Sequence, residues 1–219
     1  MLQQAPFLEI NEIEAAATSL LGRYGIAKRH VVNPPVPIDK LVNFLGLHLE
    51  IGDLYSLLEI PRDSERDLLG ALNVETKQIF AHKTIDPEVY PWREGRYHFT
   101  VCHELGHWEL HRHLIEASAR QFAFFERAAK PAFVCRMSDA SQRIEWQANK
   151  FAGCLLMPRS MLCGVWQEET RDKVPKDSVE SERITRRLAQ RFQASIPAMR
   201  IRLSDLGLGV GENRGDLGL

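Results

Sequence analysis

The apolar positions near the N-terminus repeat with the three- and four-residue spacing of an amphipathic helix: they are Ile13, Ala16, Ala17, Leu20 and Leu21. This spacing predicts a helix that begins after the N-cap Asn11 and ends at Gly25. A Pro-rich connector follows at residues 33–37, and a second short helix is predicted over 38–45, where Gly46 stops it.

The pattern then changes to that of strands. Residues 47–54 alternate between apolar and polar side chains, and residues 69–74 and 78–82 form two apolar runs on either side of a three-residue turn. Residues 83–95 contain two prolines and a glycine and are predicted to form a loop. Together these segments predict a small antiparallel or mixed sheet.

Helical spacing returns in the second half of the chain. One helix is predicted over residues 96–113, and residues 114–138 are less regular. A stripe of apolar residues then predicts a further helix that Pro158 ends. The stripe consists of Ile144, Ala148, Phe151, Ala152 and Leu155.

The last part of the chain begins with a polar stretch, residues 167–182, which we interpret as an exposed connector. Two short helices are predicted to follow it, over residues 182–192 and 197–206. The order of helices, strands and further helices predicts an α+β fold. We expect a first domain over residues 1–166 and a helical C-terminal region over residues 167–219.

The bulk composition narrows the class of protein. A chain of 219 residues can bury a core, and a net charge of −1 gives no general attraction to nucleic acid or anionic membranes. The N-terminus lacks the features of a signal peptide, and no apolar run approaches the roughly 20 residues of a membrane span. The four cysteines form no C-x-x-C pair, so we expect reduced thiols in a cytoplasmic protein.

One short motif carries recognisable chemistry: His103-Glu104-Leu105-Gly106-His107, inside a predicted helix. Residues four apart lie on one helix face, so His103 and His107 can offer two imidazole nitrogens to one Zn²⁺. Glu104 follows the first ligand and can reach a water at the metal without binding the metal itself. The motif therefore predicts a metal site that also holds a catalytic carboxylate.

A catalytic zinc site needs a third protein ligand and an open position for water, and the sequence offers three candidates. His113 has a suitable spacing, but Leu110 stands where a glycine would have to turn the chain back. His111 lies on the same helix face as His107. However, His103 and His111 would be about 12 Å apart along the helix, too far for one ion to bind both. We therefore expect His111 to lie behind the ligands or in the wall of the cleft. Glu145, on the next predicted helix, would complete a His₂Glu set.

Two blocks of the sequence resemble the ImmA/IrrE family of metallo-endopeptidases. Residues 96–107 are similar to the family's R-F-T-x-x-H-E-x-G-H block. Residues 145–158 are similar to its second block and follow in the same order. The resemblance covers about residues 70–205, and the segment between the blocks, residues 108–144, is longer than is usual in the family.

The resemblance implies a zincin-like core with a small sheet and an HExxH helix, followed by C-terminal helices. It implies one zinc ion per chain, held by His103, His107 and Glu145, with Glu104 as the general base. It also implies a substrate: a helix-turn-helix (XRE-type) transcriptional repressor, whose cleavage would derepress a prophage, mobile-element, stress or defence operon.

Further groups near the motif are candidates for roles in such a peptidase. Tyr97, His98 and His111 are candidates to donate a hydrogen bond to the oxyanion that develops during attack on the peptide bond. Cys135 lies between the two blocks and could act as a regulatory zinc ligand; the alternative is a small apolar packing residue. Residues 78–82 could expose a sheet edge along which a substrate peptide adds as an extra strand.

The two last predicted helices have the spacing of a helix-turn-helix, with no acidic residue between positions 183 and 204. Their six arginines are Arg183, Arg186, Arg187, Arg191, Arg200 and Arg202. One interpretation is contact with DNA. The interpretation that we favour is a helical pair that packs on the core as a scaffold or substrate-docking element. The rival to a peptidase is accordingly a DNA-binding regulator with a structural metal site.

Overall fold

The computed structural model describes residues 6–29, 31–59, 68–123, 139–171, 173 and 175–208. In chain order its elements are α1 (Ile10–Lys28), α2 (Ile38–Phe44), β1 (His48–Gly52), α3 (Leu54–Leu57), β2 (Gly70–Asn73), β3 (Gln78–His82), the 3-10 turns η1 (Lys83–Ile85) and η2 (Pro91–Arg93), α4 (Glu94–Gly106), the π-helical segment η3 (His107–His111), α5 (Arg112–Ala123), α6 (Asp139–Leu156), α7 (Arg159–Thr170), α8 (Ser178–Arg191) and α9 (Ile196–Asp205). The predicted α+β fold with a small sheet is confirmed.

The sheet has three strands in the order β1-β3-β2. β1 runs parallel to β3, with Leu49 opposite Ile79, and β2 runs antiparallel to β3, with Leu72 opposite Ile79. The prediction that residues 78–82 expose a sheet edge is therefore wrong. Three consecutive apolar residues of β3, centred on Phe80, are buried, as expected for a strand that is covered on both faces. In the described part of the chain, the edge strands are β1 and β2.

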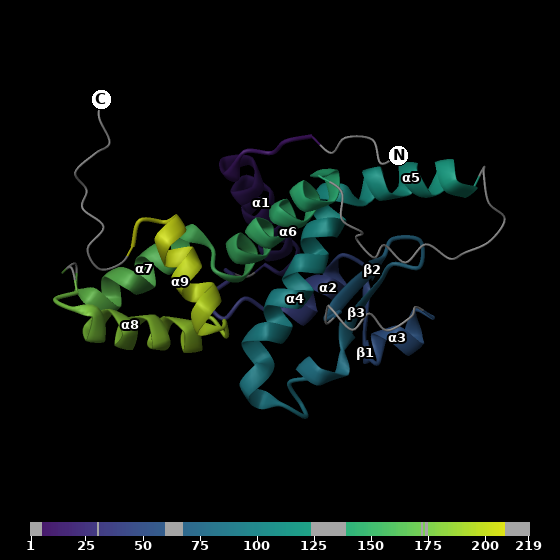
Figure 1. Ribbon diagram of the computed structural model, residues 1–219. Coiled ribbons are helices and arrows are strands. Elements are labelled where there is room, and N and C mark those ends of the chain that lie inside the picture. Colours follow the sequence, from purple (N-terminus) through teal and green to yellow (C-terminus); the bar gives the residue numbers. More distant parts are fainter. Residues whose placement is uncertain are drawn as a thin grey trace.

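Helix α4 lies between the sheet and the later helices, in the middle of the molecule (Figure 1). It contacts β2 and β3 on one side and packs extensively against α6 on another. Val101 and Leu105 of α4 are fully buried, and so are Phe151 and Leu155 of α6. None of the described helices is both long enough and apolar enough to cross a membrane.

The contact between α4 and α6 is close because both helices carry small residues where they meet. A Cβ atom at position 106 would lie 3.1 Å from the Cα atom of Ala148 and 3.2 Å from its carbonyl oxygen. Gly106 therefore lets the two backbones approach more closely than larger side chains would allow. This approach sets the distance between the HExxH motif and the residues of α6.

The C-terminal helices pack onto the same core as the rest of the chain. α9 contacts α6, and α7 and α9 each contact α8. Leu188, Met199 and Leu203 are buried in one cluster with Leu20 of α1. Residue 166, at the expected domain boundary, lies inside α7. The residues predicted as a connector begin in that helix and reach into α8, which Asp177 caps by accepting a hydrogen bond from the backbone of Glu180.

The arginines of this region are paired with glutamates. Five of them have exposed side chains, and their ion pairs are Arg183–Glu180, Arg186–Glu182, Arg187–Glu169, Arg191–Glu168 and Arg200–Glu182, with N–O separations of 2.7 to 3.6 Å. The acidic partners lie before position 183, in α7 and in the first turns of α8. The positive stripe of the sequence is thus a surface of mixed charge.

Arg202 is different, because it is buried with only 3% of its surface exposed. Its guanidinium group donates to the carbonyl oxygen of Met157 at 3.0 Å and pairs with the carboxylate of Glu14 in α1. Arg159 also pairs with Glu14, at 2.9 Å. The interpretation of Arg202 as a DNA contact is wrong, because this side chain ties α9 to α1 and to the end of α6.

We expect Arg202→Leu to lower the free energy of unfolding by about 3 kcal/mol, because the change removes one partner of a buried pair and leaves the Met157 carbonyl without its donor. Arg200→Leu, which removes an exposed arginine of the same helix, should cost about 1 kcal/mol or less. Chemical denaturation of the three chains measures both values. Equal losses in the two variants would contradict a special role for Arg202.

Candidate metal centre

Helices α4 and α6, together with the first residue of η3, bring three potential ligands to one point. The Nε2 atoms of His103 and His107 are 3.0 Å apart. The carboxylate of Glu145 lies 3.1 Å from Nε2 of His103 and 3.3 Å from Nε2 of His107. Among the described residues, this is the group of His, Cys, Asp and Glu side chains whose ligand atoms could hold a metal ion.

These separations fit a metal ion of the size of zinc. In tetrahedral coordination with metal–ligand bonds of about 2.0–2.2 Å, neighbouring ligand atoms lie about 3.3–3.6 Å apart. The three separations of 3.0 to 3.3 Å are close to that value. The donor set of two imidazoles and one carboxylate leaves one tetrahedral position for a further ligand, as catalytic zinc sites require.

Hydrogen bonds at the opposite ring nitrogens hold the two imidazoles in place. Nδ1 of His103 lies 3.0 Å from Oδ1 of Asn149, and Nδ1 of His107 lies 3.2 Å from Nδ1 of His111. An Nδ1–H group that donates to an outer partner leaves the Nε2 lone pair directed at the metal position. In this form both histidines would direct Nε2 at the position that a metal ion could occupy.

Glu104 lies beside this group without belonging to it. Its side chain is buried on α4 and faces β2, where a Cβ atom at position 70 would lie 2.6 Å from Oε1 of Glu104. Gly70 therefore makes room for the carboxylate. Burial raises the pKa of Glu104, and the charge of Glu145 adds to this effect, while His103 and His107 oppose it.

Comparison with known proteins bears on this arrangement. Residues 135–204 match the model of the M78 peptidase family, described as the IrrE N-terminal-like domain. The matched segment of this chain is therefore similar to that domain. The matched residues include Glu145 and Asn149, while the two histidines lie before the matched segment. The predicted family resemblance and the zincin-like core are thereby confirmed.

A solved structure of a Mycobacterium tuberculosis transcriptional regulator has a similar fold, with a TM-score of 0.52 and 16% sequence identity. The similarity covers 89% of this chain and 46% of that one, so this chain spans about half the length of its structural relative. At this identity the likeness concerns the fold. A search of curated protein sequences finds no match to the chain.

The charges of the site favour an ionised Glu145. Burial raises the pKa of this carboxyl, but hydrogen bonds and charge interactions with His103 and His107 outweigh burial and hold the pKa well below its usual range. Burial lowers the pKa of His103, but the hydrogen bond to Glu145 and the nearby Glu104 carboxylate raise it overall. A metal ion therefore competes with protons for these ligands and should release protons when it binds.

The other candidates from the sequence lie outside the group of three. The hydroxyl of Tyr97 donates to Asp39 of α2 at 2.9 Å, and Nδ1 of His98 lies 3.2 Å from the carbonyl oxygen of Gln193. His113 is exposed on α5. His111 is buried behind His107, on the side away from the ligand atoms. Cys135 lies outside the described residues.

The backbone changes its helical form at His107. The sequence predicts one continuous helix over residues 96–113, but α4 ends at Gly106 and residues His107–His111 form a π-helical turn. Such turns have i→i+5 hydrogen bonds, are wider than an α-helical turn and are frequent at functional sites. Within this turn the imidazoles of His107 and His111 contact each other.

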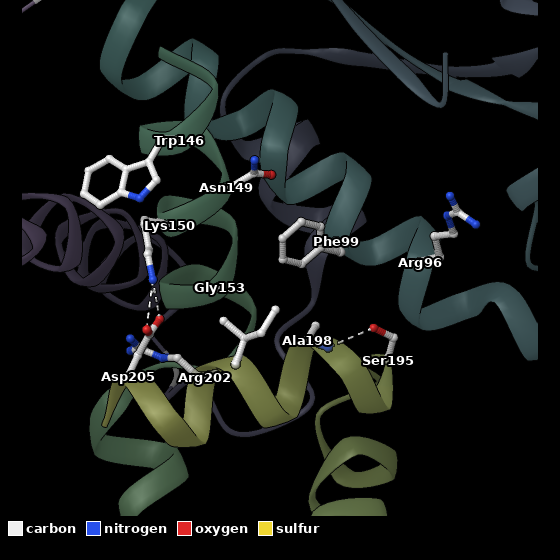
Figure 2. A pocket seen from close by; sticks show the side chains of 11 residues that line it. Arg96, Phe99, Trp146, Asn149, Lys150, Gly153, Ser195, Ala198, Arg202 and Asp205 are labelled. Atoms are coloured by element: carbon white, nitrogen blue, oxygen red, sulfur yellow. Dashed lines mark hydrogen bonds and ion pairs between the residues drawn. The ribbon is translucent and has the colours of Figure 1, made fainter. Parts of the chain in front are cut away.

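An apolar groove of about 390 Å³ adjoins the metal centre, between α4, α6 and α9. Figure 2 shows Phe99 of α4, Trp146 and Asn149 of α6, and Ala198 of α9 around it. Ile201 of α9 also lines the groove, and 61% of its surface is exposed. Asn149 both lines the groove and contacts His103, so this residue connects the groove with the group of three.

Sequence reasoning did not identify three residues that shape the site, namely Asn149, Gln147 and Gly70. A signal for Asn149 was present, because it follows Glu145 by four residues and shares its helix face. Gln147 is fully buried on an otherwise apolar part of α6. The importance of Gly70 depends on a contact between β2 and α4, which residue spacing does not reveal.

We expect the purified protein to bind one equivalent of zinc. Glu145→Ala should weaken zinc binding by more than the roughly 10–100-fold that loss of an outer-shell partner costs, because it removes a ligand. Glu104→Gln should retain its zinc. Competition with a chromophoric chelator measures the affinities, with the exposed Glu116→Ala as control. Unaltered affinity in Glu145→Ala would exclude Glu145 as a ligand.

Proposed function

We propose that this IrrE-like protein is a zinc-dependent endopeptidase that cleaves a helix-turn-helix (XRE-type) transcriptional repressor. The observation that carries the proposal is the convergence of His103, His107 and Glu145 next to a buried carboxylate, Glu104, that is not itself a ligand. A structural metal site has no need of such a carboxylate or of an open position.

Each residue of the site has a role in this proposal. His103, His107 and Glu145 would hold the zinc ion, which supplies a Lewis acid for the scissile carbonyl and lowers the pKa of a water. Glu104 accepts a proton from the attacking water and passes it to the leaving amine. The direction of its pKa shift suits this double role, because a group that acts first as a base and then as an acid works best when its pKa is close to the working pH.

The sheet offers one strand on which a substrate could lie. β2 is an edge strand among the described residues, contacts α4, and places Gly70 against Glu104. A peptide that pairs with β2 would pass the metal centre with its backbone extended. β2 therefore takes the place that the sequence analysis assigned to residues 78–82.

The groove between α4, α6 and α9 would receive an apolar side chain of this peptide. Its apolar wall contains Phe99, Ala198 and Ile201, and its volume is within the range of about 300–1,000 Å³ typical of ligand pockets. Asn149 lines the groove and contacts His103, so an apolar residue next to the cleaved bond could enter it.

The choice of substrate rests on the family. Members of the ImmA/IrrE family typically cleave helix-turn-helix repressors, and the structural relative from Mycobacterium tuberculosis is named a transcriptional regulator. Cleavage of such a repressor would derepress a stress, prophage, mobile-element or defence operon. Because the proposed substrate binds DNA, the proposal places the enzyme in the cytoplasm, where the free cysteines Cys102, Cys154 and Cys163 would stay reduced.

The ion pairs of α8 and α9 argue against the rival function of a DNA-binding regulator with a structural metal. A DNA-contacting surface needs cations that can reach phosphates. Here the five exposed arginines pair with glutamates and the sixth, Arg202, is buried. Zinc-independent, salt-sensitive DNA binding by the purified protein would favour the rival.

We expect Glu104→Gln to abolish cleavage while zinc stays bound, because the amide cannot accept the proton of water; the loss should be at least about 10²–10⁴-fold. Digestion of a peptide library, followed by mass spectrometry, measures cleavage at any sequence that the enzyme accepts. The repressor encoded closest to the gene is the second probe. The exposed Glu116→Gln serves as control, and a zinc-loaded Glu104→Gln chain that still cuts would remove Glu104 from the mechanism.

We expect Ile201→Asp to lower kcat/KM about tenfold or more for sites with an aliphatic or aromatic residue beside the cut, because a carboxylate would enter an apolar groove. Zinc content should not change, since Ile201 is not a ligand. Ile26→Asp, the same substitution at an exposed position of α1, is the control. If Ile201→Asp had the same cleavage preferences as the unaltered chain, the groove would have no part in substrate selection.

A further inference from the structure

We propose that His111, Gln147 and the backbone carbonyl of Pro6 form a positioning chain that fixes the proton arrangement of His107 and makes the N-terminal segment part of the metal centre. The inference concerns the metal site of the proposed function, but it needs no peptidase activity. None of the three groups touches the position of the metal or of a substrate, so they act through His107.

The chain of contacts is continuous over four residues. Nδ1 of His107 lies 3.2 Å from Nδ1 of His111. On the other side of that ring, Nε2 of His111 lies 2.8 Å from Oε1 of Gln147. The side-chain amide of Gln147 then donates to the carbonyl oxygen of Pro6, also at 2.8 Å.

If His111 is neutral, one arrangement of protons satisfies the three contacts of this chain. The carbonyl of Pro6 can only accept, so the amide of Gln147 must donate to it and its Oε1 must accept from Nε2–H of His111. A neutral His111 with its proton on Nε2 has a lone pair on Nδ1, which can accept from Nδ1–H of His107. The Nε2 atom of His107 is then left without a proton, as a metal ligand must be.

The surroundings favour the neutral form of His111 that this arrangement requires. His111 is 1% exposed and Gln147 is fully buried. Because a buried polar group that loses its partner destabilises the folded chain, each member of the chain is held in place by the next.

The last member of the chain lies on a segment far from the motif in sequence. Beside the bond to Pro6, the ring of Phe7 stacks on Trp146 with the ring centres 6.3 Å apart. Glu9 starts α1 through a reciprocal capping contact with Glu12. Residues before α1 are thus attached to α6 at two consecutive positions, Trp146 and Gln147, directly after the ligand Glu145.

The first test is the tautomeric state of the histidines, measured by long-range ¹H–¹⁵N NMR on the metal-free and the zinc-bound chain. We expect His111 to be neutral and protonated on Nε2, and His107 to carry its proton on Nδ1, in both forms. If His111 only filled space in the core, it would not determine which ring nitrogen of His107 carries the proton. A spectrum in which His111 carries its proton on Nδ1 would overturn the proposal.

The second test is zinc affinity, measured with zinc chloride and a competing chelator, with Co²⁺ absorption as a report on ligand geometry. His111→Leu and Gln147→Leu should each weaken zinc binding about 10–100-fold, as losses of outer-shell partners do. His113→Leu, an exposed histidine two residues away, should bind zinc like the unaltered chain. Circular dichroism identifies the folded variants. Unchanged affinity in either folded Leu variant would overturn the role of that residue.

The third test addresses the N-terminal segment and does not require a change in the core. Removal of residues 1–7 eliminates the Pro6 carbonyl and the Phe7 ring but leaves α1 and its capping residues intact. We expect weaker zinc binding and a changed Co²⁺ spectrum, and affinity equal to that of the full chain would exclude the segment from the metal centre. Because no peptide is used, a protein that binds zinc but cleaves nothing would refute the proposed function and leave this inference standing.

Discussion

The close crossing of α4 and α6 is the constraint on which the site depends. Gly106 and Ala148 let the two backbones meet, with only 3.1 Å between the Cα atom of Ala148 and the place of a Cβ atom at position 106. Glu145 lies one turn before Ala148, and the two histidines lie on either side of Gly106. The distance that brings three ligand atoms within 3.3 Å of one another is therefore set by the smallest side chains at the helix contact, not by the ligands.

The cost of burying so many polar groups between two helices is offset by their hydrogen bonds. If His103, His107 or Glu145 moved, the ion pairs and hydrogen bonds among them would be lost. Asn149 contacts Nδ1 of His103, and His111 contacts Nδ1 of His107. Such networks stabilise a single arrangement because a partly satisfied buried network costs more than an apolar one. Fold stability and ligand geometry are thus properties of the same contacts.

The sequence predicted the parts of this structure that follow from local periodicity. The HExxH spacing, the stripe on α6 and the apolar runs of β2 and β3 all depend on residues close in the chain. The sequence did not predict the central place of β3, the π-turn at His107 or the burial of Arg202. Each of these depends on which segments meet in space. β1 pairs with one edge of β3. Arg202 forms an ion pair with Glu14, which is 188 residues away in the sequence. Spacing alone treats an arginine on a helix as a surface charge, which holds for Arg200 and fails for Arg202.

The C-terminal helices are part of the site and not an appendage, and this bears on their resemblance to a helix-turn-helix. A recognition helix must present an exposed face to the major groove of DNA. Helix α9 buries Met199 and Leu203 in the core, and its residues Ala198 and Ile201 face the groove beside the metal centre. The ion pair between Lys150 of α6 and Asp205, at 2.8 Å, fixes the far end of the same helix. A helix held in this way can form the wall of the groove, whereas its insertion into DNA would require it to leave the core.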